Sequence, residues 1–203
     1  MTRFERSFVR RVDGLNRWLG RLVMYGIFVM MGILLWSSIS KTFFLPSLWT
    51  LEVAQFAMVA YYILGGPYSI QLGANVRMDL FYHEWTIRKK AWFDGITVLF
   101  LMFYLGVMIY GGVGSTAYSL GYFGNEPFTF FWDLFVGFVT GGPEGAKEVM
   151  GYIERSPTAW RPFLWPIKTI MCIGLTLMLL QALSELVKDL ARIRGEEFGG
   201  EEI

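Results

Sequence analysis

The 203-residue sequence is 54% hydrophobic and 18% aromatic, and its 18 basic side chains nearly balance 17 acidic ones. This composition is too apolar for an average soluble domain, and the near-zero net charge gives no support for nucleic-acid binding. The single cysteine, Cys172, excludes an intrachain disulfide and a cysteine-based metal site. The composition favours an integral membrane protein.

Residues 1–21 predict an amphipathic helix with a basic face. Apolar residues recur at intervals of three and four positions: Phe4, Phe8, Val12, Leu15, Trp18 and Leu19. Arginines occupy positions between them: Arg3, Arg6, Arg10, Arg11, Arg17 and Arg21. Such a helix suits the cytoplasmic membrane surface. The alternative is a charged flank that only sets the orientation of the chain.

Apolar stretches long enough to cross the ~30 Å hydrocarbon layer follow. They predict spans at about 22–40, 52–73, 91–120 and 162–184 within a membrane domain at 22–190. Basic residues concentrate before the first span, between the second and third spans, and after the fourth, which places these segments inside. We therefore expect an all-α integral membrane protein with four transmembrane helices, an N-in/C-in topology and a flexible tail at 191–203.

A long periplasmic loop, 121–160, is expected between the third and fourth spans. Its apolar segment 128–140 contains Asp133 and is too short to span, so it should lie in the outer interface or pack on a partner.

Small residues mark expected packing positions within the spans. Gly65, Gly66 and Pro67 predict a kink in the second span. The third span has a predicted small-residue packing face: Gly106, Gly111, Gly112, Gly114 and Ser115. Bulky residues of the first and fourth spans remain for a partner or lipid: Phe28, Met31, Leu35, Met171, Leu175 and Met178.

Charged residues near the span ends are the candidate structural or partner-binding residues. Glu52, Trp160 and Arg161 are expected at the outer rim, where Glu52 and Arg161 are predicted to pair. Lys168, the one charge within a span, is expected to reach the outer surface beside tryptophans. Arg77 and Asp79 should lie in the cytoplasmic turn after the second span, where they either contact a partner or only end the helix and set orientation.

No residue pattern predicts catalysis, a cofactor or a metal. His83 is the only histidine and lies outside the predicted spans, so paired haem ligands are absent. Glu52, Asp94 and Glu185 fall at span ends, so no span offers the deep carboxylate of a proton-coupled exporter. We expect a protein that is not an enzyme.

The order of several motifs resembles a known family. These are Trp49 and Glu52 at the outer start of the second span, Gly73-Ala74-Asn75-Val76-Arg77-Met78-Asp79 at its end, and the fourth-span entry that begins at Ser156. Together they resemble the small, DctQ-like permease subunit of tripartite ATP-independent periplasmic (TRAP) transporters, over most of residues 15–192. Asn75 replaces the family's usual histidine, and an amide can still donate and accept hydrogen bonds.

The resemblance implies a small scaffold subunit in the inner membrane of a bacterium or archaeon. Its expected partners are a large DctM-like permease subunit, a periplasmic substrate-binding protein and membrane lipids. The complex would import an organic acid by symport driven by an ion gradient, with sodium as the expected coupling ion. The alternative function is a free-standing four-span scaffold or assembly factor without a transport role.

Overall fold

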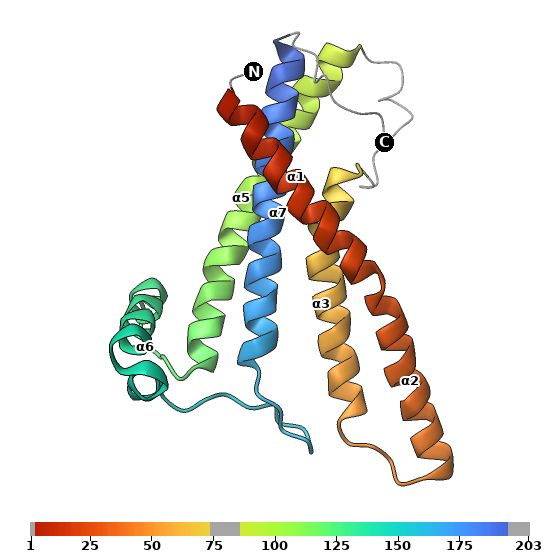
Figure 1. Cartoon of the computed structure of the whole chain (residues 1–203), viewed down its shortest axis with the longest axis vertical. Coiled ribbons are helices and arrows are strands. Elements are labelled where there is room, and N and C mark those ends of the chain that lie inside the picture. Colours follow the sequence, from red (N-terminus) through yellow and green to blue (C-terminus); the bar gives the residue numbers. More distant parts are fainter. Residues whose placement is uncertain (1–2, 74–85, 195–203) are drawn as a thin grey trace. The chain divides into compact units, whose positions relative to one another are not determined.

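The computed structural model describes residues 3–73 and 86–194, and these residues are predominantly helical (Figure 1). The helices are α1 (Arg3–Met24), α2 (Gly26–Phe43), α3 (Thr50–Gln71), α5 (Ile87–Ser119), α6 (Pro127–Val149) and α7 (Trp165–Ile193). The extended pairing in these ranges is an isolated antiparallel bridge between Arg155 and Phe163. The all-helical expectation is confirmed for the described residues.

The chain divides into two compact units, which are considered separately. The first contains Met1–Met24, Leu64–Val107 and Gly174–Ile203, and the second contains Tyr25–Ile63 and Met108–Ile173.

By length and composition, 3 helical stretches of the described chain are able to cross a membrane. They are Arg3–Phe43, Trp92–Ser119 and Trp165–Ile193. The predicted span 52–73 forms the continuous helix α3, with Pro67 inside it. Tyrosines, glutamines and adjacent glycines make α3 less apolar than the other stretches. Four crossings therefore remain a prediction.

Helix α2 has the packing expected of a helix in an apolar medium. Its only buried residue is Ser40. Large hydrophobic side chains are exposed along it: Ile27, Phe28, Val29, Met31, Leu34, Leu35, Trp36 and Ile39. A helix that is apolar on all faces is stable in lipid or against a protein partner rather than in water.

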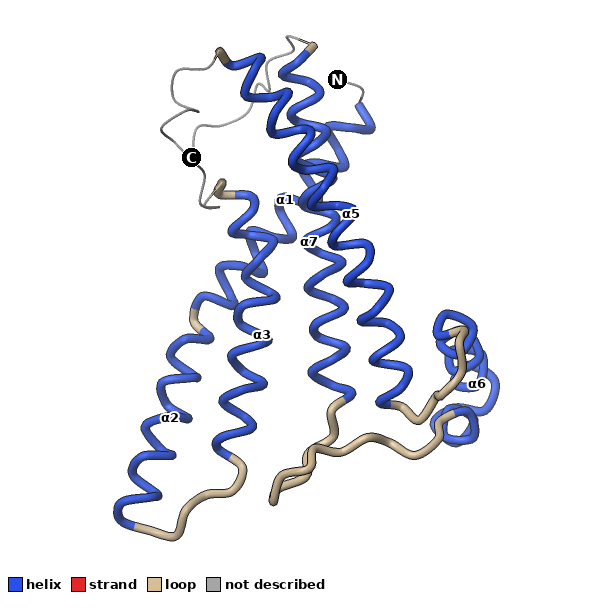
Figure 2. The backbone as a smooth tube through the Cα atoms, turned by 180° about the vertical axis from the view of Figure 1, so that it is seen from behind, coloured by secondary structure: helices blue, strands red, loops and turns tan. Residues whose placement is uncertain are grey.

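A hydroxyl cluster joins α2 to α3 in the second unit. Ser40 Oγ lies 3.1 Å from Ser47 Oγ, which lies 2.9 Å from Thr50 Oγ1. Thr50 Oγ1 in turn donates to Ser37 Oγ at 3.2 Å. Figure 2 shows α2 and α3 joined by a loop. These bonds fix the turn where the chain reverses.

In the first unit, glycines allow close contact between helices. A Cβ at Gly20 of α1 would overlap the Tyr68 side chain of α3, and one at Gly66 would overlap Met178 of α7. Pro67 is fully buried beside them. The expected role of the Gly65–Ser69 region in internal packing is thus confirmed at Gly66.

Only part of the predicted small-residue face of the third span packs against another helix. A Cβ at Gly112 of α5 would lie 3.0 Å from Cys172 Sγ of α7, in the second unit. Gly106, Gly111 and Gly114 have nothing within 4 Å of such a Cβ. The prediction of one continuous packing surface is therefore wrong, because these glycines lie at different positions around the helix.

The prediction that bulky side chains of the fourth span face a partner or lipid is also wrong in part. Leu175 is 5% exposed, within the packed first unit. Met178 contacts Gly66, and Met171 packs near Gly112. The Met178 and Met171 side chains therefore occupy space beside glycines of other helices. Phe28, Met31 and Leu35, by contrast, are exposed on α2.

The long loop contains α6, which is two short helices joined at a break. Gly142 has φ 63° and ψ −151°, a conformation that favours glycine, and Pro143 follows it. The two limbs fold back, so that a Cβ at Gly137 would lie 2.8 Å from the Gly145 carbonyl oxygen. Phe130 anchors the first limb on α5 beside Ala117 and Leu120. The expected apolar segment 128–140 is therefore helical.

The first limb of α6 leaves an apolar stripe exposed. Its members are Phe128, Trp132, Phe135 and Val139. The Phe128 ring lies 6.2 Å from the Tyr110 ring of α5, so aromatic surface continues from one helix to the other. Whether membrane or protein covers it, as expected from the sequence, stays a prediction.

We predict that Gly20→Ala destabilises the chain by about 1–3 kcal/mol, because the new methyl group meets the root of the Tyr68 side chain. Gly14→Ala is the matched control in the same helix, since nothing lies within 4 Å of its added Cβ. Thermal unfolding in detergent should show a lower Tm for Gly20→Ala and an unchanged or higher Tm for Gly14→Ala. Equal Tm values would show that α1 and α3 do not pack at Gly20.

Candidate functional site

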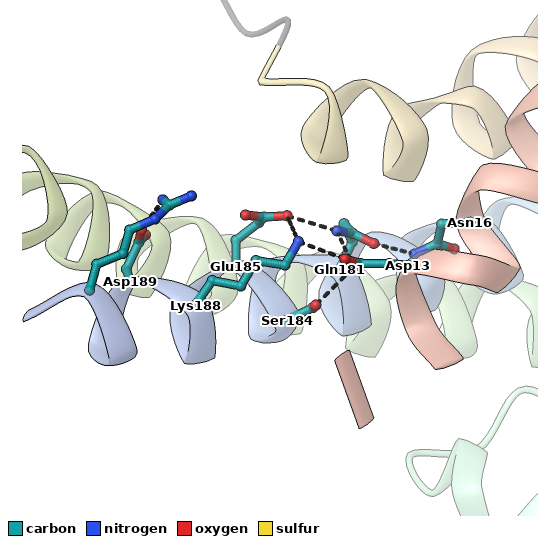
Figure 3. Close-up of polar contacts among 8 residues, drawn as sticks. Asp13, Asn16, Gln181, Ser184, Glu185, Lys188 and Asp189 are labelled. Carbon is teal, nitrogen blue, oxygen red and sulfur yellow. Dashed lines mark hydrogen bonds and ion pairs between the residues drawn. The ribbon is translucent and has the colours of Figure 1, made fainter. Parts of the chain in front are cut away.

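A buried polar cluster joins α1 to α7 in the first unit (Figure 3). We call it the α1–α7 polar cluster, and its members are Asp13, Asn16, Gln181, Ser184, Glu185 and Lys188. The α7 members are separated by three, four and seven residues, so they share one helix face. The α1 members, three residues apart, share the facing side of α1.

Gln181 is the centre of the hydrogen bonding. Asn16 Nδ2 donates to Gln181 Oε1 at 2.7 Å. Gln181 Nε2 donates to Asp13 Oδ1 at 3.0 Å and to Glu185 Oε1 at 2.9 Å. Ser184 Oγ also donates to Asp13 Oδ1, at 2.9 Å. Because Gln181 is 0% exposed, these bonds replace water that it would otherwise bind.

Lys188 supplies the positive charge of the cluster. Its Nζ lies 2.7 Å from Asp13 Oδ2 and 2.8 Å from Glu185 Oε1. The Lys188 side chain is 15% exposed, so these ion pairs are screened less than surface pairs. The cation thus allows carboxylates from two helices to lie together. One turn further along α7, Arg192 Nη1 pairs with Asp189 Oδ1 at 2.9 Å.

This arrangement positions helices; it does not resemble a catalytic or metal site. No group of three or more histidine, cysteine or acidic side chains in the described ranges has the geometry to hold a metal ion. Every hydrogen-bonding contact given above runs within or between α1 and α7. The bonds specify the rotation of α1 about its axis as well as its attachment, since only one face of α1 carries Asp13 and Asn16.

This cluster is not among the sites predicted from the sequence. Its signal is Gln181-x-x-Ser184-Glu185-x-x-Lys188, a polar face that follows directly on an apolar run. In a membrane helix such a row usually marks a partner for another polar helix face.

In the second unit, Glu52 has a different partner from the one predicted. It is 3% exposed, and its Oε1 accepts a hydrogen bond from Ser156 Oγ at 3.1 Å. Its Oε2 has no partner in the described part of the chain. Arg161 is exposed, with φ 52°, and no ion pair there joins it to Glu52. The predicted pairing is therefore wrong, because the loop hydroxyl covers Glu52.

Lys168 is paired, whereas we expected it to extend to the outer surface. Its Nζ lies 2.7 Å from Glu154 Oε2 and donates to the Ser115 carbonyl at 3.2 Å. It also lies 5.9 Å from the centre of the Tyr118 ring. A cation at the last carbonyls of α5 is favourable because the C-terminal end of a helix carries partial negative charge. Lys168 thereby holds the long loop against α5 and α7 within the second unit.

The other candidates have no contact that assigns a role. Trp160 is exposed in the loop before α7. Arg77 and Asp79, with Asn75, lie outside the described residues, so the expectations for the turn after α3 stay predictions.

We predict that Lys188→Met weakens the packing of α1 on α7 by up to about 3 kcal/mol, because two partly buried carboxylates lose their cation. The matched control is Lys147→Met, which breaks an exposed pair with Glu144 and should cost about 0–1 kcal/mol. Limited trypsin digestion measures the difference, since the arginines of α1 are cleavage sites once α1 detaches. Equal cleavage in the two variants would contradict the proposed role of Lys188.

The comparisons with known proteins identify the family. The family described as "Tripartite ATP-independent periplasmic transporters, DctQ component" matches residues 30–192, well over half of the chain. No significant match was found among curated proteins or among solved structures. The matched range begins within α2 and extends nearly to the end of α7, and its long apolar helices are those of a multi-pass membrane protein. The chain belongs to the DctQ component family of the TRAP transporters.

Proposed function

We propose that this chain is the stationary scaffold of a TRAP transporter in the inner membrane of a bacterium or archaeon. It holds a large DctM-like permease subunit, which imports an organic acid that a periplasmic binding protein delivers. A sodium gradient drives the import, and the chain itself is not an enzyme. The observation that carries this proposal is the DctQ match over residues 30–192.

The polar contacts support a mechanical role. Lys188 joins α1 to α7, and Lys168 joins the long loop to α5 and α7, each by a short ion pair and a further polar contact. Contacts of this kind hold the helices of each unit together, and a scaffold must keep its structure while its partner moves.

The exposed surface of α2 indicates where we expect the large subunit to bind. Its exposed side chains, including Phe28, Met31 and Leu35, have no partner helix on their own face within the described ranges. Helices already in lipid associate through close packing over a broad area, since burying apolar surface gains little there. We therefore expect the interface to depend on many small contributions along α2.

The proposed topology has four crossings with both termini in the cytoplasm. Its support is the concentration of arginine and lysine before α2, between α3 and α5, and after α7. The long loop with α6 then lies in the periplasm.

Transport assays test the scaffold role. We predict that deleting this chain abolishes uptake by the co-expressed large subunit. Phe28→Ala, Met31→Ala and Leu35→Ala should each retain most of the uptake, because each removes a small part of a broad interface. Leu175→Ala is the contrasting variant, since this buried side chain stabilises the chain itself, and it should lower the Tm by the equivalent of about 2–5 kcal/mol.

Full uptake by the large subunit alone would contradict the scaffold role. Failure of the two proteins to copurify would favour the alternative, a free-standing four-span scaffold or assembly factor.

Cysteine labelling tests the topology in a Cys172→Ser background, from which the only native cysteine has been removed. We predict that Asp79→Cys reacts with an impermeant maleimide only from the cytoplasmic side. Glu144→Cys, in the exposed second limb of α6, should react only from the periplasmic side. Labelling of Asp79→Cys from the periplasm would overturn the N-in/C-in assignment.

A further inference from the structure

Helix α1 has three distinct faces, and only one of them packs on the rest of its unit. The buried face consists of Val9, Val12, Asn16, Gly20 and Val23. At 100° per residue these positions cover less than a third of the circumference. The rest of the helix surface is exposed or partly exposed, and it has two chemically different parts.

The first of these parts is an apolar stripe. Its members are Phe4, Leu15, Trp18 and Leu22, all exposed. Phe4 is 80% exposed and Trp18 is 62% exposed, so most of each side chain meets the surrounding medium. An exposed apolar surface of this kind usually marks an interaction surface.

The second part is a row of arginines that runs beside the apolar stripe. Its members are Arg3, Arg6, Arg10, Arg17 and Arg21, which recur near the helical period on the side away from Val12 and Val23. Arg11 lies within the apolar stripe, between Phe4 and Leu15, and its long side chain can extend along the apolar surface to place its guanidinium group at headgroup level. A guanidinium group binds phosphate oxygens in a bidentate manner, so this row is suited to anionic headgroups.

The two parts together match the boundary of a bilayer. An apolar stripe enters the acyl-chain region while an adjacent basic row reaches the phosphates of acidic lipids. The chain sequence agrees, because α2, an apolar helix able to cross a membrane, begins at Gly26, directly after Tyr25. An acidic protein surface would match the arginines but would leave the apolar stripe uncovered.

We propose that α1 is a binding site for acidic phospholipid. Phe4, Trp18 and Leu22 lie in the acyl-chain boundary, and the arginine row binds the headgroup phosphates. The α1–α7 polar cluster sets the rotation of α1, so that both parts face the bilayer while Val9 and Asn16 face the core. The site belongs to this chain alone and does not depend on the proposed transport role.

Lipid binding to the folded chain raises its stability, which provides the first test. The full chain in phosphatidylcholine-containing micelles is titrated with phosphatidylglycerol. We expect a Tm increase of about 5 °C, the effect of several arginine–headgroup contacts on a chain of this size. In Arg6→Gln/Arg10→Gln/Arg17→Gln the increase should fall to less than half.

The matched control removes the same charge elsewhere: Lys41→Gln/Lys147→Gln/Arg161→Gln, at exposed positions outside α1. It should keep the full increase. Arg3→Gln/Arg10→Gln/Arg21→Gln is a second α1 variant should the first not fold. An equal loss in the α1 variants and the control would overturn the proposal, because the effect would then depend on net charge alone.

Membrane depth provides the second test. A spin label is placed at Trp18→Cys in a Cys172→Ser chain reconstituted in phosphatidylglycerol-containing nanodiscs. We expect greater accessibility to oxygen than to a water-soluble nickel relaxer. Greater accessibility to nickel would place the stripe in water, and shielding from both would place it against protein; either result overturns the proposal.

Discussion

The packing of α1 on α7 in the first unit depends on one positive charge that neutralises two carboxylates. Asp13 comes from α1 and Glu185 from α7, and Lys188 lies within ion-pair distance of both. Without the cation, two carboxylates in a region of low water content would repel one another and the helices that carry them. Gln181 and Ser184 satisfy the remaining lone pairs, so the charges are both neutralised and hydrogen-bonded. The value of such a network is specificity, since an apolar contact would permit α1 to slide or rotate.

Apolar packing has a smaller part in this chain than in a soluble protein. Helices surrounded by lipid already have an apolar environment, so their choice of neighbour depends on close approach and polar contacts. Gly20, Gly66 and Gly112 each admit a side chain from another helix. Lys168 and Glu154 perform in the second unit the task that Lys188 and Asp13 perform in the first. The exposed surface of α2 is left for other molecules.

The helices could be predicted from the sequence because apolar runs of membrane-crossing length leave little choice of structure. The polar partners could not. Asp13 and Gln181 are 168 residues apart, and Ser156 and Glu52 are 104 apart, so no local pattern relates them. Opposite charge suggested Arg161 as the partner of Glu52, yet a neutral hydroxyl occupies that place. Similarly, the glycines of the third span suggested one packing face, but only Gly112 has a close neighbour, because helical direction rather than composition decides contact.

The break in α6 has a consequence for biosynthesis. At 23 residues, α6 would be long enough to be retained in the bilayer as it leaves the insertion machinery, were it one straight apolar helix. Gly142 and Pro143 divide it into limbs that are each too short, and the second limb carries Glu144, Lys147 and Glu148. In the proposed four-span topology, the segment would then pass through the translocation channel. A retained α6 would reverse the direction in which α7 crosses in that topology and would carry Lys188 to the side opposite Asp13, so the helix break would protect a contact formed far away in the sequence.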